Sequence, residues 1–236
     1  MPAPISYRCL GAPAGCHTLP AMSLRRTVSS IVKRARFHGS ARYWERRYST
    51  GGTSGSGSYG ELAELKAAVV NRMVVEQGIT SVIDFGCGDG NQLRYGKYPR
   101  YLGLDVAPSA IRKCAELFAD DSSKSFILYE GAHFHDRARW LHADAALSLE
   151  VIFHLVEDNV FDLYMRHLFD TADRQVIICA TDRDDLPSAP QERHRPFSRW
   201  IADNRPGWTL AEHVPLAAAA LASDVFRYER EGDGSH

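Results

Sequence analysis

One segment near the first third of the chain, SVIDFGCGDG at 81–90, constrains the fold more than any other. Its first half, 81–85, is short and mostly apolar, which is typical of a buried strand. Glycines then alternate with other residues at Gly86, Gly88 and Gly90, where a backbone without a Cβ can turn sharply and approach a ligand. A buried strand ending in such a loop predicts a ligand-binding turn at the carboxyl end of a parallel sheet.

Strand and helix patterns alternate along the rest of the chain. The expected strands are 81–85, 101–106, 125–129, 143–149 and 175–180, with 208–213 and 223–229 as a closing antiparallel pair. The expected helices are 59–77, a short one near 90–95, 108–118, 151–160, 161–169 and 196–204. This order predicts one doubly wound α/β domain, with a mostly parallel seven-stranded sheet covered by helices on both faces.

The first long helix is preceded by the glycine- and serine-rich stretch GGTSGSGSYG at 51–60. Ser58 followed three residues later by Glu61 predicts a capping box at the start of this helix. A stretch of this composition is typical of a flexible tether. Because it leads into a capped helix, it also suits a lid or an anion-cradling turn, and both interpretations stand.

A carboxylate follows the glycine loop at the end of the next strand. Asp105 occupies this position, where it can accept both hydroxyls of a ribose. The short helix expected after the loop would add unpaired N–H groups for a carboxylate or phosphate. The spacing here is G-x-G-x-G, whereas dinucleotide sites use G-x-G-x-x-G. The pair of features therefore indicates a nucleoside-containing cofactor other than a dinucleotide.

The segment Asp84–Gly90, acidic-x-G-x-G-x-G, resembles motif I of the class I S-adenosylmethionine-dependent methyltransferases. Three further segments are similar to that family: the aromatic YWERRY at 43–48, the second-strand segment at 101–111, and the fourth strand with its following residues at 144–155. The resemblance spans residues 43–180. It implies a Rossmann-like methyltransferase fold, here at 41–230, and S-adenosylmethionine as the cofactor.

The resemblance also implies roles for the matching residues. The implied cofactor-binding residues are Asp84, Phe85, Gly86, Cys87, Gly88, Gly90, Asp105, Val106, Ile111, Ser148 and Leu149. Those from 84 to 90 would hold the methionine portion and Asp105 the ribose, while Val106 and Ile111 would pack near the adenine. Ser148 and Leu149 would line the floor beneath the transferred methyl group. For the adenine amine, Glu130 and Asp136 are both candidates.

Methyl transfer to an alcohol requires positioning of the acceptor and removal of its proton. His154 lies just after the fourth expected strand, at the rim where an acceptor enters, and histidine has a suitable pKa for a base. Its alternative role is packing within the helix expected from Val151. Glu150 and Asp182 have oxygens that suit Mg²⁺, but solvated carboxylates are the simpler interpretation and no metal is predicted. His194 and Arg195 are candidates to grip a polar or anionic acceptor, or else are surface charges.

Composition limits the classes of partner that the chain is expected to bind. The chain has 28 basic and 29 acidic residues and no stripe of basic and aromatic side chains, so no nucleic acid is predicted as a partner. The predicted acceptor is a small molecule or glycan, methylated at oxygen. No apolar run reaches the roughly 20 residues of a membrane span. Five cysteines without metal spacing predict free thiols and a cytoplasmic location.

The first 40 residues form a basic leader, since the first acidic residue is Glu45 and seven Lys or Arg residues precede it. Translation could begin at Met22, or the leader could be flexible. Alternatively, residues 24–35 form a short amphipathic helix that contacts an anionic membrane surface weakly. Residues 231–236 are predicted to be a flexible tail. Two rival functions remain open: an S-adenosylmethionine-binding module without catalysis, and a membrane-surface adaptor.

Overall fold

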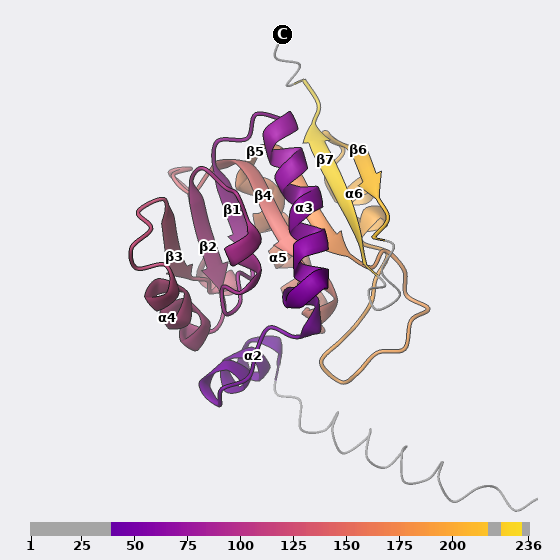
Figure 1. The fold of residues 1–236 in the computed structure, drawn as a ribbon. Helices are drawn as coiled ribbons and strands as arrows, with labels where there is room; N and C mark the ends of the chain where they lie inside the picture. The colour runs from indigo at the N-terminus through magenta and orange to yellow at the C-terminus, as the bar shows by residue number, and fades with distance from the viewer. Residues whose placement is uncertain (1–38, 217–222, 233–236) are drawn as a thin grey trace, which may run out of the picture. The chain divides into compact units, whose positions relative to one another are not determined.

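The computed structural model describes residues 39–216 and 223–232, and a seven-stranded sheet forms the centre of this part of the chain (Figure 1). The strands are β1 Val82–Phe85, β2 Tyr101–Asp105, β3 Lys124–Leu128, β4 Ala143–Leu149, β5 Ala172–Ala180, β6 Trp208–Val214 and β7 Asp224–Arg230. Their order in the sheet is β3-β2-β1-β4-β5-β7-β6. Strands β1 to β5 pair in parallel, and β7 runs antiparallel to both β5 and β6. The predicted mostly parallel sheet with a closing antiparallel pair is confirmed.

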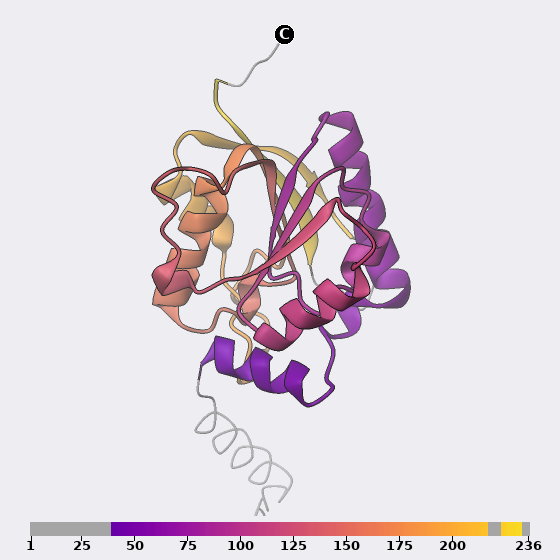
Figure 2. The same cartoon turned by 90° about the vertical axis from the view of Figure 1, so that its left-hand side faces the viewer.

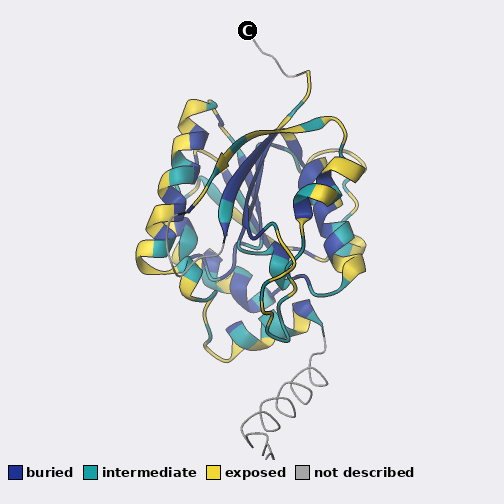
Figure 3. Cartoon of the chain, turned by 90° about the vertical axis from the view of Figure 1, so that its right-hand side faces the viewer, coloured by how far each residue is buried: buried dark blue, intermediate teal, exposed yellow. Residues whose placement is uncertain are grey.

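Helices cover both faces of this sheet (Figure 2). The α-helices are α2 Ser40–Ser49, α3 Gly60–Glu76, α4 Pro108–Leu117, α5 Asp158–Asp170 and α6 Phe197–Asn204. The 3₁₀ turns are η1 Ser56–Ser58, η2 Gln92–Tyr95, η3 Gly131–His133 and η4 Ile152–His154. Apolar residues of α3 and α4 pack in a core on one face, and those of α5 and α6 pack in a core on the other. The central strands are therefore buried on both faces, as the dark blue ribbons in Figure 3 show.

The start of α3 differs from the prediction. No side chain caps this helix, and Tyr59 takes the N-cap position in an extended conformation. Ser58 belongs to η1 instead, and its carbonyl oxygen accepts a hydrogen bond of 2.6 Å from Asn91 Nδ2. The predicted capping box between Ser58 and Glu61 is therefore wrong.

Two other predicted helices are replaced by shorter turns. After the glycine loop the chain forms only η2, because Gly96 and Pro99 follow it closely and interrupt a longer helix. The α-helix whose N-terminus was expected to face the loop is therefore replaced by a 3₁₀ turn. The helix predicted from Val151 is also wrong: Glu150 has a φ of +64°, which leaves the right-handed path, and η4 and a loop precede α5.

Some predictions fall outside the described residues. These are the basic leader up to residue 38 and residues 233–236 of the predicted tail. Among the helices that the structure describes, none has the length and apolar character needed to cross a membrane.

Candidate active site

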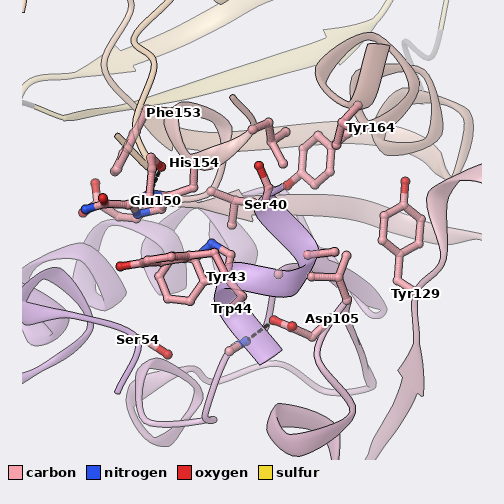
Figure 4. A pocket seen from close by; sticks show the side chains of 18 of the residues that line it. Ser40, Tyr43, Trp44, Ser54, Asp105, Tyr129, Glu150, Phe153, His154 and Tyr164 are labelled. Atoms are coloured by element: carbon pink, nitrogen blue, oxygen red, sulfur yellow. Dashed lines mark hydrogen bonds between the residues drawn. The ribbon is translucent and has the colours of Figure 1, made fainter. Parts of the chain in front are cut away.

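A cavity of about 880 Å³ lies at the carboxyl ends of the parallel strands (Figure 4). The cavity wall includes at least one residue from just past the end of each of these five strands: Gly86, Val106, Glu130, Glu150 and Thr181. The sheet order reverses between β1 and β4, since β2 and β3 extend to one side and β5 to the other. Ligands of open α/β sheets bind at such a switch point.

The glycine loop forms one wall of the cavity. Gly86 and Gly88 have φ values of +88° and +60°, which favour glycine over other residues. A Cβ on Gly86 would lie 2.5 Å from Val151 Cγ2, and one on Gly88 would collide with Ser54 Oγ. These glycines are therefore required by neighbouring segments of the chain as well as by the tightness of the turn.

Asp105 is fixed against this loop by backbone groups. Its Oδ2 accepts a hydrogen bond from the Gly88 N–H (2.9 Å), and its Oδ1 accepts one from the Ala107 N–H (2.8 Å). Burial raises the pKa of the Asp105 carboxyl to about 6, and these backbone hydrogen bonds oppose the rise. The carboxylate is thus held in one orientation at the cavity wall and is mostly ionised at pH 7.

Asp84, at the end of β1, has one oxygen without a partner. Its Oδ2 accepts a hydrogen bond from the Tyr101 hydroxyl (2.7 Å), whereas Oδ1 is buried and has no hydrogen-bond partner among the described residues. Burial raises the pKa of this carboxyl to about 6 as well. Asp84 is among the residues that line the cavity, and buried polar atoms are normally satisfied, so a donor group of a ligand is a candidate partner for this oxygen.

Helix α2 covers the cavity and is fastened to the core at two places. The Glu45 carboxylate accepts hydrogen bonds from the backbone N–H (2.9 Å) and the hydroxyl (2.7 Å) of Ser109, at the start of α4. The backbone N–H and hydroxyl of Ser40 donate to the Glu157 carboxylate at 2.9 and 2.6 Å, just before α5. The aromatic segment singled out at 43–48 therefore lies within a helix that lines the cavity.

The segment 51–60 is clasped onto the glycine loop. Asp89 accepts hydrogen bonds from the Ser54 N–H (2.9 Å), the Ser54 hydroxyl (2.8 Å) and the Tyr59 hydroxyl (2.7 Å). Tyr48 of α2 joins this cluster through a 3.0 Å hydrogen bond between its hydroxyl and that of Ser54. Residues 54–58 line the cavity, so the tether interpretation is wrong and the segment forms part of the cover.

His154 lies in the opposite half of the cavity, in η4. Its Nδ1 is 3.3 Å from the backbone carbonyl oxygen of Gln191, and its ring packs against Trp44 and Phe153, with centroids 4.9 and 4.5 Å away. Burial lowers the pKa of His154, which favours the neutral ring at pH 7. With Nδ1 donating to the carbonyl, Nε2 carries the lone pair of the neutral ring.

Of the two residues that were candidates to bind a polar acceptor, His194 and Arg195, only His194 is among the residues that line the cavity. His194 lines the cavity, with its Nδ1 at 2.6 Å from the Thr181 hydroxyl. Arg195 donates hydrogen bonds to the carbonyl oxygens of Leu155 (2.6 Å) and Val156 (2.9 Å). Arg195 therefore braces the loop after η4 and is not directed at an acceptor.

The two acids considered as metal ligands are not brought together. Glu150 lines the cavity, while Asp182 accepts a hydrogen bond from the Ser198 N–H (2.9 Å) at the start of α6. Within residues 39–216 and 223–232, no group of three or more His, Cys, Asp or Glu side chains is arranged to hold a metal ion.

The predicted cofactor residues divide into two sets. Those that line the cavity are Asp84, Gly86, Cys87, Gly88, Asp105, Val106 and Leu149. Those that do not line it are Phe85, Gly90, Ile111 and Ser148. Successive side chains of a strand point to opposite faces of the sheet, and a helical side chain faces one side of its helix. Residues of the second set therefore point away from the cavity although they are close to it in the sequence.

Each residue of the second set has neighbours elsewhere. Phe85 is fully buried in the core beneath α5 and α6, and Ser148 accepts a 2.7 Å hydrogen bond from the Tyr164 hydroxyl in that same layer. Ile111 packs in the core on the other face of the sheet. Gly90 faces Cys114 of α4.

The segment after β3 places the two candidates for the adenine amine differently and adds cavity residues that the sequence did not single out. Glu130 lines the cavity, whereas Asp136 closes a turn by accepting hydrogen bonds from the N–H groups of Trp140 (3.0 Å) and Leu141 (2.7 Å). Tyr129 and Tyr164 also line the cavity, and they come from opposite ends of the chain segment between β3 and β5. No sequence motif marks these two tyrosines.

Sequence comparison gives a limited match. No protein-family model matches the chain. The small RNA 2′-O-methyltransferase of Arabidopsis thaliana is 28% identical over 109 residues, which cover 42% of this chain and 12% of the length of that protein.

Solved structures match more of the chain. The N-methyltransferase NodS of Bradyrhizobium japonicum WM9, in complex with S-adenosyl-L-homocysteine, has a TM-score of 0.63 at 14% identity and covers 82% of this chain and 99% of its own. Magnesium protoporphyrin IX methyltransferase of Synechocystis PCC 6803 has a TM-score of 0.56 at 17% identity, covering 87% and 99%. The small RNA methyltransferase HEN1 has a TM-score of 0.57 at 16% identity, covering 74% and 26%. The chain therefore has the Rossmann-like fold of S-adenosylmethionine-dependent methyltransferases, which confirms the predicted resemblance at the level of fold.

Proposed function

We propose that this chain is an enzyme that binds S-adenosylmethionine and transfers its methyl group to an oxygen of a small-molecule or saccharide-like acceptor. The observation that carries the proposal is a single cavity lined both by the Asp105–glycine-loop wall and by His154. The solved structures described above are methyltransferases, and three structures, of NodS and of magnesium protoporphyrin IX methyltransferase, contain S-adenosyl-L-homocysteine or S-adenosylmethionine.

The residues of the glycine-loop half fit the cofactor. Asp105 has a fixed carboxylate that would accept the ribose hydroxyls, and the unpartnered Asp84 Oδ1 would accept a hydrogen bond from the α-ammonium group. Glu130 lies at the end of β3, where it would contact the adenine. When bound, the cofactor supplies an electrophilic methyl group on a sulfonium.

The residues of the His154 half would handle the acceptor. His154 Nε2 would take the proton of the acceptor hydroxyl, while the Gln191 carbonyl oxygen holds the ring in the tautomer that leaves Nε2 free. Trp44 and Phe153 pack around this ring and would limit the access of water. His194 is available on the same wall as a second contact for a polar acceptor.

Calorimetric titration with S-adenosyl-L-homocysteine, followed by transfer of a labelled methyl group to fractions of metabolites and glycans, tests the proposal. We expect saturable binding and label in an O-methyl product. Binding without any labelled acceptor would favour the non-catalytic module. If the protein neither binds the cofactor nor labels an acceptor, but the chain binds anionic vesicles, the membrane-surface adaptor would be the favoured function.

RNA is a second candidate acceptor, and it contradicts the absence of nucleic acid predicted from composition. Two of the matches described above are small RNA methyltransferases, and the Arabidopsis thaliana protein is a 2′-O-methyltransferase. A ribose 2′-hydroxyl is itself a saccharide hydroxyl, so the same base would serve. Labelling of a short RNA, but not of the same RNA with a 2′-deoxy 3′ end, would identify this acceptor.

We also propose that residues 41–230 are the catalytic domain and that the enzyme works in the cytoplasm. Cys87, Cys114 and Cys179 are free thiols, which is typical of a reducing compartment. Cell fractionation with a tagged full-length chain would test the location.

A further inference from the structure

Helix α2 carries three arginines whose positive charges are not neutralised by a neighbouring carboxylate. Arg42, Arg46 and Arg47 form no ion pair with any residue that the structure describes. Glu45 is the one acid of this helix, and its carboxylate is bonded to the backbone N–H and the hydroxyl of Ser109. The helix therefore presents a net positive charge to its surroundings.

One of these charges is held close to the proposed base. Arg42 and Arg47 are both among the residues that line the cavity. The guanidinium carbon of Arg47 lies 5.6 Å from the centroid of the Trp44 ring, and the His154 ring lies 4.9 Å from that same ring, beside which Figure 4 shows it. Arg47 Nε donates a hydrogen bond to the Thr53 carbonyl oxygen, which fixes the guanidinium without neutralising it. A positive charge is therefore held one aromatic ring away from His154.

The other two arginines extend this charge to the outside of the cavity. Arg42 and Arg46 are one helical turn apart, so their side chains lie on the same side of α2. Both are exposed, and neither side chain has a hydrogen bond or an ion pair within residues 39–216 and 223–232. By contrast, the exposed Arg72 and Arg166 are each paired with carboxylates. Arg42 is thus an unoccupied cation at the mouth of the cavity, and Arg46 continues the positive surface along the helix.

The acids in this part of the cavity belong to other walls. Glu150 follows strand β4, and Glu192 lies in the loop before α6, where it accepts a 3.2 Å hydrogen bond from the Ala189 N–H. Glu157 also lines the cavity, but both of its oxygens accept hydrogen bonds from Ser40. The cover is therefore positive and the sheet side is negative. An acceptor that places its hydroxyl at the base and a negative group towards α2 fits this division.

Phosphate is the negative group that fits best. The planar guanidinium of arginine matches two phosphate oxygens with parallel N–H donors. Phosphate is also the negative group that a saccharide and an RNA strand, the two acceptor classes considered above, have in common. Arg195, the arginine predicted for an anionic acceptor, has its donors on backbone carbonyl oxygens instead.

We propose that Arg42 and Arg47 bind a phosphate group of the acceptor, which is therefore a phosphorylated sugar or an RNA strand with the methylated hydroxyl next to that phosphate. The proposal rests on the proposed function and assigns the acceptor a charge. Arg46 lies further along α2, so it would contact a second phosphate when the acceptor is a strand.

Calorimetric titration of the full chain, saturated with S-adenosyl-L-homocysteine, tests the proposal with ribose and ribose 5-phosphate. We expect ribose 5-phosphate to bind at least about tenfold more tightly than ribose, because arginine donates charge-assisted hydrogen bonds to the phosphate. Arg42→Gln and Arg47→Gln should each weaken its binding by about 5–10-fold, and Arg47→Lys, which keeps the charge, by less. Arg42→Gln should leave the Kd for S-adenosyl-L-homocysteine within about twofold.

A short single-stranded RNA, followed by fluorescence anisotropy, distinguishes the two sources of phosphate. If the acceptor is a strand, Arg42→Gln, Arg46→Gln and Arg47→Gln should each weaken RNA binding, and each should lower the salt dependence of log Kd by about 0.7. If it is a phosphorylated sugar, Arg46→Gln should change the affinity for neither probe.

Arg100→Gln is the matched control, because it removes an exposed arginine just before β2, at the end of the sheet away from the cavity. Binding of both probes that is the same in the Arg42, Arg47 and Arg100 variants, or binding of neither probe, would overturn the proposal while the proposed function stands. If S-adenosyl-L-homocysteine itself does not bind, the proposed function fails. The same probes titrated into the ligand-free protein then still decide whether α2 binds phosphate.

Discussion

Two halves of one cavity are held together by different kinds of contact. In the glycine-loop half, Asp105 is bonded by the backbone N–H groups of Gly88 and Ala107, which are 17 and 2 residues away in the sequence. In the His154 half, the contacts join distant segments: Ser40 with Glu157, 117 residues apart, and Arg195 with Leu155, 40 residues apart. The Asp105 wall of the first half depends on local backbone geometry. The cover of that half, held by Ser54 and Asp89, which are 35 residues apart, and the second half depend on how separate segments meet.

This difference has a functional meaning. Local backbone contacts fix a constant binding surface, which suits a cofactor that does not vary. Side chains on loops can be exchanged without disturbing the sheet, which suits an acceptor that differs from one enzyme to the next. Substitutions in the two halves should therefore separate cofactor binding from transfer.

The largest effect is expected in the acceptor half. His154→Ala should lower kcat by about 10²–10⁴-fold because the base is removed, while the Kd for S-adenosyl-L-homocysteine stays within about twofold. His133→Ala, which removes an exposed ring outside the cavity, is the matched control. Steady-state kinetics with calorimetry would measure both values. Unchanged turnover would remove His154 as the base, and a large loss of cofactor binding would break the separation of the halves.

The corresponding change in the cofactor half is Asp105→Ala. Two hydrogen bonds from a carboxylate to ribose hydroxyls, at about 1.5–3 kcal/mol each, correspond to at least about a 100-fold rise in Kd. Asp120→Ala, at an exposed position, should leave the affinity unchanged. Full-strength binding by a folded Asp105 variant in a calorimetric titration would refute the ribose assignment.

A smaller effect is expected on the free energy of unfolding, because burying the Asp84 carboxylate in the cofactor half destabilises the folded state. Because burial raises the pKa of Asp84 from 3.8 to about 6, the folded protein holds this proton more tightly than the unfolded chain does. Ionising Asp84 between about pH 4 and 6 therefore destabilises the folded state, and Asp84→Asn should raise the free energy of unfolding by about 1–3 kcal/mol at pH 7.

Urea unfolding at several pH values would measure this difference. It should be near zero below pH 4, grow up to about pH 6, and stay constant above. A variant that is less stable at pH 7 would contradict the burial argument. The same variant should bind the cofactor more weakly.

The smallest effect is expected at the clasp between segment 51–60 and the glycine loop. Asp89→Ala removes the hydrogen bonds to Ser54 and Tyr59, so segment 51–60 should open more often and the cofactor Kd should rise by about tenfold, with little change in kcat. Faster proteolysis within 51–60 would report the opening independently. Equal losses of affinity and kcat would show that the clasp also supports the acceptor half.

Sequence patterns predicted the parts of the site that depend on neighbouring residues. The strand, the glycine loop and Asp105 are close in the sequence, and each has a characteristic residue type at a required position. The parallel pairing of β1 to β5 also follows from the alternation of strands and helices. The fold was predicted correctly, and seven of the eleven predicted cofactor residues line the cavity; six of these seven belong to the segments around the glycine loop and Asp105.

Other parts could not be predicted because the pattern carries no information about them. Strand β4 is buried on both faces, so no apolar–polar alternation shows that Leu149 faces the cavity while Ser148 faces α5. The positive φ of Glu150, which prevents the predicted helix at 151–160, occurs at a residue that rarely adopts it. The carbonyl of Gln191, which orients His154, belongs to a loop 37 residues away and has no motif.

The fastening of α2 also has a consequence for timing. The Tyr48 hydroxyl of this helix forms a hydrogen bond with that of Ser54, which lies against Gly88, and the Trp44 ring packs on His154. One helix therefore covers both halves of the cavity. In the proposed enzyme, exchange of the spent cofactor would require the bonds of Glu45 and Ser40 to part, whichever acceptor has reacted. Release of that product, rather than the chemical step, would then set the pace of turnover, and a rapid first round followed by a slower steady rate would be its kinetic signature.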